Sequence, residues 1–213
     1  DGDNDGSFYG YLVDGVNVTS GPTELIGDPG ATFPDGPAEG TTGTVQGTAQ
    51  GIAILDGQSF EQSNVVIKDF SISAMSGTAS NNGDVNFHAG IFTFTNGDVN
   101  SGSTTVDIEN VKIEGLDFSD TGDNFSANIS LSNFGTPESA SQAINIDGVT
   151  IRNSEHRGIA IAGGTAEDIS VTIEDKDSSG DDTVIENIAV GNDAHGLHSE
   201  RGGVFTSVAN LVV

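Results

Sequence analysis

The sequence contains no cysteine, so no disulfide can cross-link the fold. It also has no tryptophan, and only 6 Lys and Arg residues stand against 32 Asp and Glu, which gives a formal net charge of −26 at pH 7. With so few cations there is no basic stripe to meet a phosphate backbone, and nucleic acid is excluded as a partner. No apolar run approaches the roughly 20 residues that cross a bilayer, so no membrane span is predicted.

The excess of acidic residues also indicates an environment. Like charges repel one another and oppose the compact state. Salt, divalent cations or both are the physical means of offsetting that repulsion. We therefore expect a secreted or cell-surface protein of a marine or saline environment, with Ca²⁺ as cofactor. The chain begins at Asp1 rather than at Met and shows no signal peptide. We expect a processed mature chain or a region cut from a longer one.

A six-residue pattern recurs along the chain: apolar, polar, Asp/Asn/Gly, apolar, any residue, apolar. It starts at Val13, Ile67, Ile108, Ile146 and Ile185. The last four copies begin about 40 residues apart, a spacing typical of solenoids. Asp, Asn and Gly tolerate the left-handed backbone conformation, so the third position predicts a bend between two strands. The shared position predicts that the last four isoleucines stack in one column.

A second pattern lies between copies of the first and consists of a short alternating strand introduced by a small residue. It occurs at residues 51–54, 90–94, 127–131, 158–161 and 203–205. Together the two patterns give one strand, a loop, a second strand, a bend and a third strand in each coil. The predicted fold is all-β: a right-handed parallel β-helix, a solenoid with three short strands per coil and about four to five coils.

The whole chain, residues 1–213, is expected to form a single β-helix domain. Residues 1–18 would hold the first strand and a calcium loop, and residues 20–50, rich in Gly, Thr and Pro, would be a loop-rich insertion. Residues 169–173 alternate as a strand should and are interpreted as an additional strand inside a loop.

These patterns resemble the pectate-lyase-like β-helix superfamily, with bend-forming residues at Asp69, Asn110 and Asn187 forming a ladder. In character the chain is most similar to bacterial extracellular adhesin and fibre β-helices. The resemblance is one of architecture. It implies a family that includes polysaccharide lyases, phage tailspikes, autotransporter passengers and adhesins, so the fold alone does not select a function.

Two acidic segments are candidate calcium sites. Asp1, Asp3 and Asp5 alternate before Gly6, like the first half of a calcium loop. Position twelve is Leu12 rather than the Glu of an EF-hand, so the segment resembles shorter extracellular calcium loops, with Asp14 as a candidate fourth ligand. A weaker candidate site has four carboxylates, from Asp175, Asp177, Asp181 and Asp182. The alternative for both segments is a solvated acidic stretch.

An enzymatic interpretation depends on four residues that precede or begin predicted strands: His156, Arg157, His198 and Arg201. A uronate lyase or epimerase needs a base to remove the proton beside a carboxylate, and cations to neutralise that carboxylate. Polar residues at a turn are the simpler interpretation. We predict no catalytic residues and keep the enzyme as the second hypothesis.

The two ends of the chain carry candidate assembly residues. The apolar C-terminal segment contributes Val204, Phe205, Val208, Leu211 and Val213, and the N-terminal segment contributes Tyr11 and Val13. With Val204 interpreted as a first-strand residue and Val13 as a second-strand residue, one copy would continue into the next. Such a heterologous contact does not close, and it predicts a head-to-tail homopolymer.

Three functions follow from these observations. The first is a non-enzymatic extracellular structural protein, a fibre subunit or adhesin segment of the kind found in a biofilm matrix, stabilised by calcium. The second is a polysaccharide lyase or epimerase acting on a uronate-containing polymer. The third is a carbohydrate-binding module with an extracellular polysaccharide as partner, although the chain offers only 2 Tyr and 11 Phe as stacking surfaces.

Overall fold

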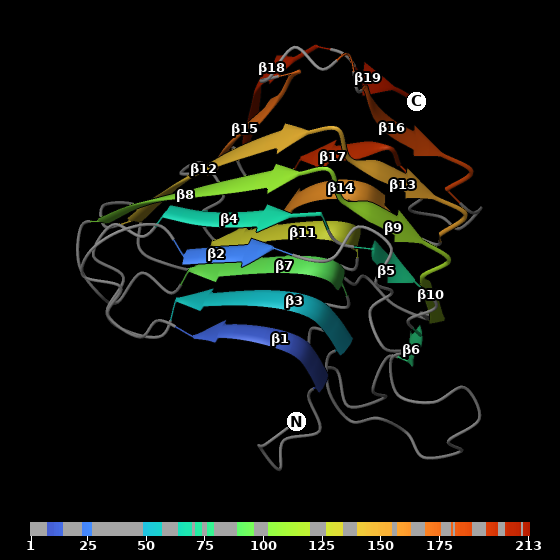
Figure 1. Ribbon diagram of the computed structural model, residues 1–213, viewed down its shortest axis with the longest axis horizontal. Helices are drawn as coiled ribbons and strands as arrows, with labels where there is room; N and C mark the ends of the chain where they lie inside the picture. The colour runs from blue at the N-terminus through green and yellow to red at the C-terminus, as the bar shows by residue number, and fades with distance from the viewer. Residues whose placement is uncertain are drawn as a thin grey trace.

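The computed structural model describes most of the strands and several of the corners between them. The described residues are 8–14, 23–26, 49–56, 64–69, 71–73, 76–78, 89–95, 102–119, 127–133, 140–154, 157–162, 169–175, 180, 182–188, 195–199, 203–209 and 211–213. All regular structure in these ranges is β-strand, and no helix among them is long and apolar enough to cross a membrane. Figure 1 shows the strands stacked in layers from the N-terminal to the C-terminal part.

Three parallel sheets run along the stack. Sheet A contains β1 (Phe8–Asp14), β3 (Ala49–Asp56), β7 (Ala89–Thr95), β11 (Ala127–Asn133), β14 (Arg157–Ala162) and β17 (Leu197–Ser199). Sheet B contains β2 (Thr23–Ile26), β4 (Asn64–Lys68), β8 (Gly102–Glu109), β12 (Ala140–Asp147), β15 (Ile169–Ile173) and β18 (Val204–Val208). Sheet C contains β5 (Ser71–Ser73), β9 (Lys112–Glu114), β13 (Thr150–Arg152), β16 (Thr183–Glu186) and β19 (Leu211–Val212). Beside sheet C, β6 (Ser76–Thr78) pairs with β10 (Asp117–Ser119).

The chain visits sheets A, B and C in turn, and each strand pairs in parallel with the strand one coil away. Five successive coils contain all three strands, and β1 with β2 precedes them. This confirms the all-β parallel β-helix with three short strands per coil. β2 lies within residues 20–50, where the sequence showed little strand pattern.

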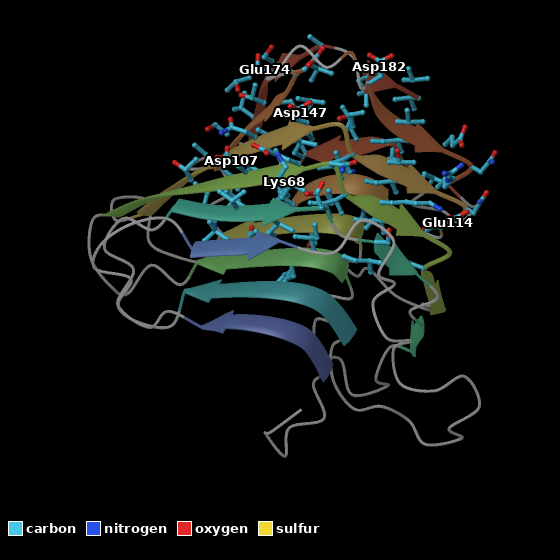
Figure 2. All side chains as sticks on the ribbon, in the orientation of Figure 1. Lys68, Asp107, Glu114, Asp147, Glu174 and Asp182 are labelled. Atoms are coloured by element: carbon cyan, nitrogen blue, oxygen red, sulfur yellow. The ribbon has the colours of Figure 1, made fainter. Side chains whose placement is uncertain are left out.

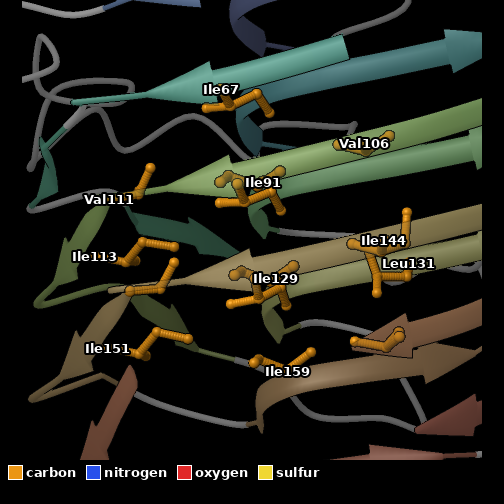
Figure 3. Packing of buried hydrophobic residues seen from close by; sticks show 14 of the residues in the cluster. Ile67, Ile91, Val106, Val111, Ile113, Ile129, Leu131, Ile144, Ile151 and Ile159 are labelled. Atoms are coloured by element: carbon orange, nitrogen blue, oxygen red, sulfur yellow. The ribbon is translucent and has the colours of Figure 1, made fainter. Parts of the chain in front are cut away.

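The core consists of columns of aliphatic residues that rise from coil to coil. In sheet B, the Cα atoms of Ile67, Ile108, Ile146 and Ile173 are partners in successive strands. In sheet C, the corresponding column contains Ile72, Ile113, Ile151 and Ile185. All eight side chains are at most 1% exposed. Figure 3 shows Ile113 above Ile151, beside the sheet A column of Ile91, Ile129 and Ile159. Each buried side chain contributes about 1.5–3 kcal/mol to stability.

The prediction that Ile185 continues the column of Ile146 is wrong. Ile185 is the partner of Ile151 in sheet C, and residues 169–173 are the regular sheet B strand of that coil rather than an additional one. The reason is that a coil has two sharp corners of the same chemistry. Asn153 and Asn187, with φ of 52° and 51°, turn the chain after sheet C in the same way as the predicted bend residues turn it before sheet C. The sequence pattern therefore matches both corners.

Two polar ladders follow from these corners. Before sheet C, Asn110 donates from its side-chain amide to the carboxylate of Asp69, as predicted, and Gly148 occupies the next step with φ of 59°. After sheet C, Asn187 donates to Asn153 at 3.2 Å, so Asn187 belongs to this second ladder and not to the first. Asn, Asp and Gly tolerate the left-handed conformation, which explains why they occupy these corners.

The strand types assigned to the two ends of the chain are also corrected. Val13 is the Cα partner of Ile54 in sheet A, so it is a first-strand residue. Val204 is the partner of Ser170 in sheet B, so it is a second-strand residue. The first strand of the last coil is β17, which follows the small residue Gly196 as the second sequence pattern requires.

Candidate functional site

The last coil is the candidate site, because its three strands lie at the ends of their sheets. Among the described residues, β17, β18 and β19 each pair with a strand of the preceding coil and with none beyond it. In Figure 1, β18 and β19 lie at the top of the stack, close to the C-terminus. Parallel strands in such a position present backbone groups and side chains that the next coil would normally cover.

The core columns continue into this coil and end there. In sheet B, Phe205 is the partner of Val171, and Val208 is the partner of Ile173. Leu197 lies on Ile159 in sheet A, and Leu211 lies on Thr183 in sheet C. These registers show that the last coil continues the inward-facing rows of the coils below it.

Val213 ends the sheet C column. A Cβ atom added at Gly196 would lie 3.0 Å from Cγ1 of Val213 and 3.9 Å from Cγ2 of Ile185, so the two side chains share one corner of the core. The exposed fraction rises from 1% at Ile185 to 77% at Val213, and from 0% at Ile173 to 47% at Val208. We name this surface the end face, defined by Leu197, Phe205, Val208, Leu211 and Val213.

A β-bulge interrupts β18. The register shifts between Val171 and Thr172, and the extra residue Thr206 donates from Oγ1 to the carbonyl oxygen of Val171 at 3.1 Å. Thr206 Oγ1 also lies 3.0 Å from Thr172 Oγ1. Bulges and short strands weaken pairing at a sheet edge, and β17 and β19 have only 3 and 2 residues. Backbone pairing at this edge is therefore weak, and the end face is mainly a surface of apolar side chains.

The corner between sheets C and A holds β17 tightly against the coil below. Gly158 donates its N–H to the carbonyl oxygen of His195 at 2.8 Å, and Ile159 donates to that of Gly196 at 2.9 Å. A Cβ atom at Gly158 would lie 2.5 Å from the Gly196 oxygen and 2.8 Å from Cγ2 of Ile185. Only glycine permits this approach, which fixes the position of the residues before β17.

The outer faces of sheets B and C carry charge in rows. Lys68 Nζ lies 3.0 Å from Glu109 Oε2, and Arg152 lies 3.7 and 3.8 Å from the carboxylates of Glu114 and Glu186. Lys112 also forms an ion pair with Glu114. Figure 2 shows Asp107, Glu174 and Asp182 on the outside of the same coils. Among the described residues, Lys68, Lys112 and Arg152 are thus each paired with a carboxylate.

The candidate catalytic residues are only partly described. Arg157 begins β14 and is 4% exposed, and its carbonyl oxygen accepts a hydrogen bond from the buried amide of Asn128 at 2.9 Å. His198 is in β17, where its partner is Ala160. His156 and Arg201 lie outside the described residues. The burial of Arg157 does not support a role on a polysaccharide in a surface groove.

The predicted calcium ligands also fall largely outside the described residues. This applies to Asp1, Asp3, Asp5, Asp177 and Asp181. Asp14 ends β1, and of its surroundings only the strand pairing is described. Asp175 accepts a hydrogen bond from the Gly180 N–H at 3.0 Å, and Asp182 is exposed just before β16. Within the described ranges, no three His, Asp or Glu side chains are grouped as metal ligands. Calcium therefore stays a prediction.

The assembly residues proposed from sequence are better described. Phe205, Val208, Leu211 and Val213 lie on the end face, whereas Val204 is 49% exposed beside Ser170 on the outer side of sheet B. Tyr11 and Val13 are in β1, the outermost described strand of sheet A at the other end. The sequence-based choice of assembly residues missed Leu197, although the run Gly196-Leu197-His198-Ser199 fits the first-strand pattern.

Comparison with known proteins identifies no relative. No protein-family model matches the chain, and no curated protein or solved structure matches it. The parallel β-solenoid architecture therefore rests on the strand order and registers described above.

Proposed function

We propose that this protein is a non-enzymatic extracellular structural protein that stacks head to tail into fibres through the end face. The observation that carries the proposal is the abrupt exposure of the core columns in the last coil, where Val213 is 77% and Val208 47% exposed. Covering such apolar area is worth about 25 cal/mol per Å². A solenoid gains this energy by adding one more coil.

A second copy of the chain is the occupant that the coil order favours. The last described strand, β19, belongs to sheet C, and a strand of sheet A comes next in the order A, B, C. The first described strands, β1 and β2, lie at the other ends of sheets A and B. A second copy would thus set its β1 beside β17 and its β2 beside β18, all parallel. The strand types differ from those inferred from sequence, so the proposed continuation now runs from a sheet C strand of one copy to a sheet A strand of the next.

Charge opposes this assembly and gives it a salt dependence. Subunits with a net charge of −26 repel one another. Salt screens that repulsion over about 8 Å at physiological ionic strength. Calcium bound by Asp1, Asp3, Asp5 and Asp14 would lower it further and stabilise the first coil. We place the protein with the adhesin-like and fibre-like members of the pectate-lyase-like β-helices, at the cell surface or in a biofilm matrix.

Sedimentation velocity and electron microscopy test the proposal. We expect the purified chain to form filaments in salt and calcium. Val208→Asp puts a charge on the end face and should leave monomers. Val212→Asp is the matched control, because Val212 is 50% exposed but its partner Val184 lies on the outer side of sheet C. A wild-type chain that stays monomeric at high concentration, or equal effects of the two substitutions, would contradict the proposal.

Calcium is tested separately by thermal unfolding. A ligand that binds only the native state stabilises it by about 2.7 kcal/mol at a hundredfold excess over Kd. We expect a higher melting temperature in calcium than in EDTA, and no such difference after Asp1, Asp3 and Asp5 are replaced by Asn. An unchanged melting temperature in the original chain would remove calcium from the proposal without affecting the stacking.

A further inference from the structure

His195 and His198 form a pair of imidazoles at the rim of the end face. Their ring centroids lie 5.3 Å apart, and the ring planes are inclined at 51°. His195 is exposed and His198 is partly exposed. Residues three apart on a straight strand would point to opposite faces of the sheet. The bend at Gly196, just before β17, brings the two rings together instead.

The spacing of the rings fits a shared metal ion. Imidazole nitrogens bind Zn²⁺ at about 2.0–2.1 Å, and two imidazoles on one tetrahedral ion have ring centroids about 5 Å apart. The separation of 5.3 Å between the two ring centroids is close to that value, and the ring planes are inclined at 51° rather than parallel. The pair therefore needs little movement to place two nitrogens on one ion.

The backbone on which the two side chains sit is fixed by the coil below. The carbonyl oxygens of His195 and Gly196 accept hydrogen bonds of 2.8 and 2.9 Å from β14, and His198 is held in register with Ala160. Gly196 is further confined by the side chain of Val213. Two metal ligands on a backbone held in this way lose less conformational freedom when they bind a metal ion than two ligands on a loose segment would.

We propose that His195 and His198 bind a borderline divalent transition-metal ion, represented by Zn²⁺, with water in the remaining coordination positions. Imidazole suits zinc, nickel and copper, whereas carboxylates suit magnesium and calcium. The site is thus chemically distinct from the calcium loop predicted at the N-terminus. It does not depend on the fibre proposal, because both histidines belong to one copy.

The test is calorimetric titration of the whole chain with zinc chloride in the presence of excess magnesium, which occupies the acidic surface. We expect one zinc ion per chain, with binding lost in His195→Gln and in His198→Gln. His88→Gln and His156→Gln, which replace the other two histidines of the chain, should bind zinc as the original chain does. Circular dichroism checks that each variant is folded.

A second measurement uses the unmodified chain, so it does not depend on the folding of a variant. Zinc should protect His195 and His198 from modification by diethyl pyrocarbonate, as read by peptide mass spectrometry, and leave the extent of modification of His88 unchanged. Unchanged reactivity of the pair in zinc, zinc binding that survives His195→Gln, or binding abolished by magnesium would overturn the proposal.

Discussion

The side-chain amide of Asn187 donates a hydrogen bond to Oδ1 of Asn153, one coil away, at 3.2 Å. Both residues have positive φ, and Asn153 in turn donates to Glu114 Oε1 at 3.2 Å. The corner after sheet C therefore depends on Asn in two ways. The residue adopts a left-handed conformation at low cost, and its amide links successive coils.

Substitutions at Asn153 separate these two contributions. Asn153→Gly keeps the backbone conformation and loses the side-chain hydrogen bonds, which we expect to cost about 1 kcal/mol. Asn153→Ala loses the same hydrogen bonds and also strains the backbone, because the alanine side chain cannot form the local hydrogen bond that makes positive φ tolerable for Asn. We expect a total cost of about 2 kcal/mol. Urea unfolding measures both. Equal losses for the two variants would show that backbone strain plays no part.

The column of Ile108 predicts the effect of emptying the core. Ile108 is 0% exposed and lies between Ile67 and Ile146. Ile108→Ala should cost about 2–5 kcal/mol, and Ile108→Val about 0.5–1.5 kcal/mol. Thr105→Ala, on the outer face of the same strand, is the control and should stay within about 0.5 kcal/mol. A small loss at Ile108, similar to that at Thr105, would argue against this column as the core.

A buried polar contact between sheets A and B gives a third prediction. Thr93 Oγ1 donates to Gln142 Oε1 at 2.9 Å, and the two residues are 1% and 2% exposed. Thr93→Val or Gln142→Leu alone leaves a buried polar group without this partner, which should cost about 1–3 kcal/mol. The double variant should lose less than the sum of the single variants in a urea double-mutant cycle. Strict additivity would contradict a direct contact.

The architecture could be predicted from the sequence because its signal is repeated. Alternation recurs in the sheet A strands, as in residues 90–94 and 127–131, and the bend before sheet C recurs at Asp69, Asn110 and Gly148. An error in one copy therefore does not alter the fold class. The assignment of Ile185 failed because Asn187 has the same backbone requirement as Asn110. Periodicity alone cannot distinguish two corners that use the same residue types.

The site was only partly predictable for related reasons. The apolar composition of residues 204–213 pointed to this segment, and Val208 and Val213 are exposed in the structure. The bulge at Thr206 depends on one extra residue relative to β15, which no local pattern encodes. The contact between His195 and His198 depends on the bend at Gly196, whereas a straight strand would have separated the two side chains.

The ion pair on sheet C predicts a pH dependence. The hydrogen bond from Lys112 is the largest influence that lowers the pKa of Glu114 below its ordinary value of 4.5, with smaller contributions from Asn153 and Arg152 and an opposing effect of burial. A carboxyl whose pKa is lower in the folded state stabilises the fold above the unfolded pKa, and this stabilisation is lost as the pH falls through the folded pKa. Because the side chains of Lys112 and Glu114 are 45% and 33% exposed, we expect the ion pair to stabilise the fold by no more than about 1 kcal/mol.

Glu114→Gln should therefore reduce the free energy of unfolding slightly at neutral pH, and the difference from the original chain should shrink in urea unfolding well below pH 4.5. Lys112→Met should reproduce this convergence, whereas a gap that stays constant down to acid pH would show that Glu114 acts through packing rather than through its charge.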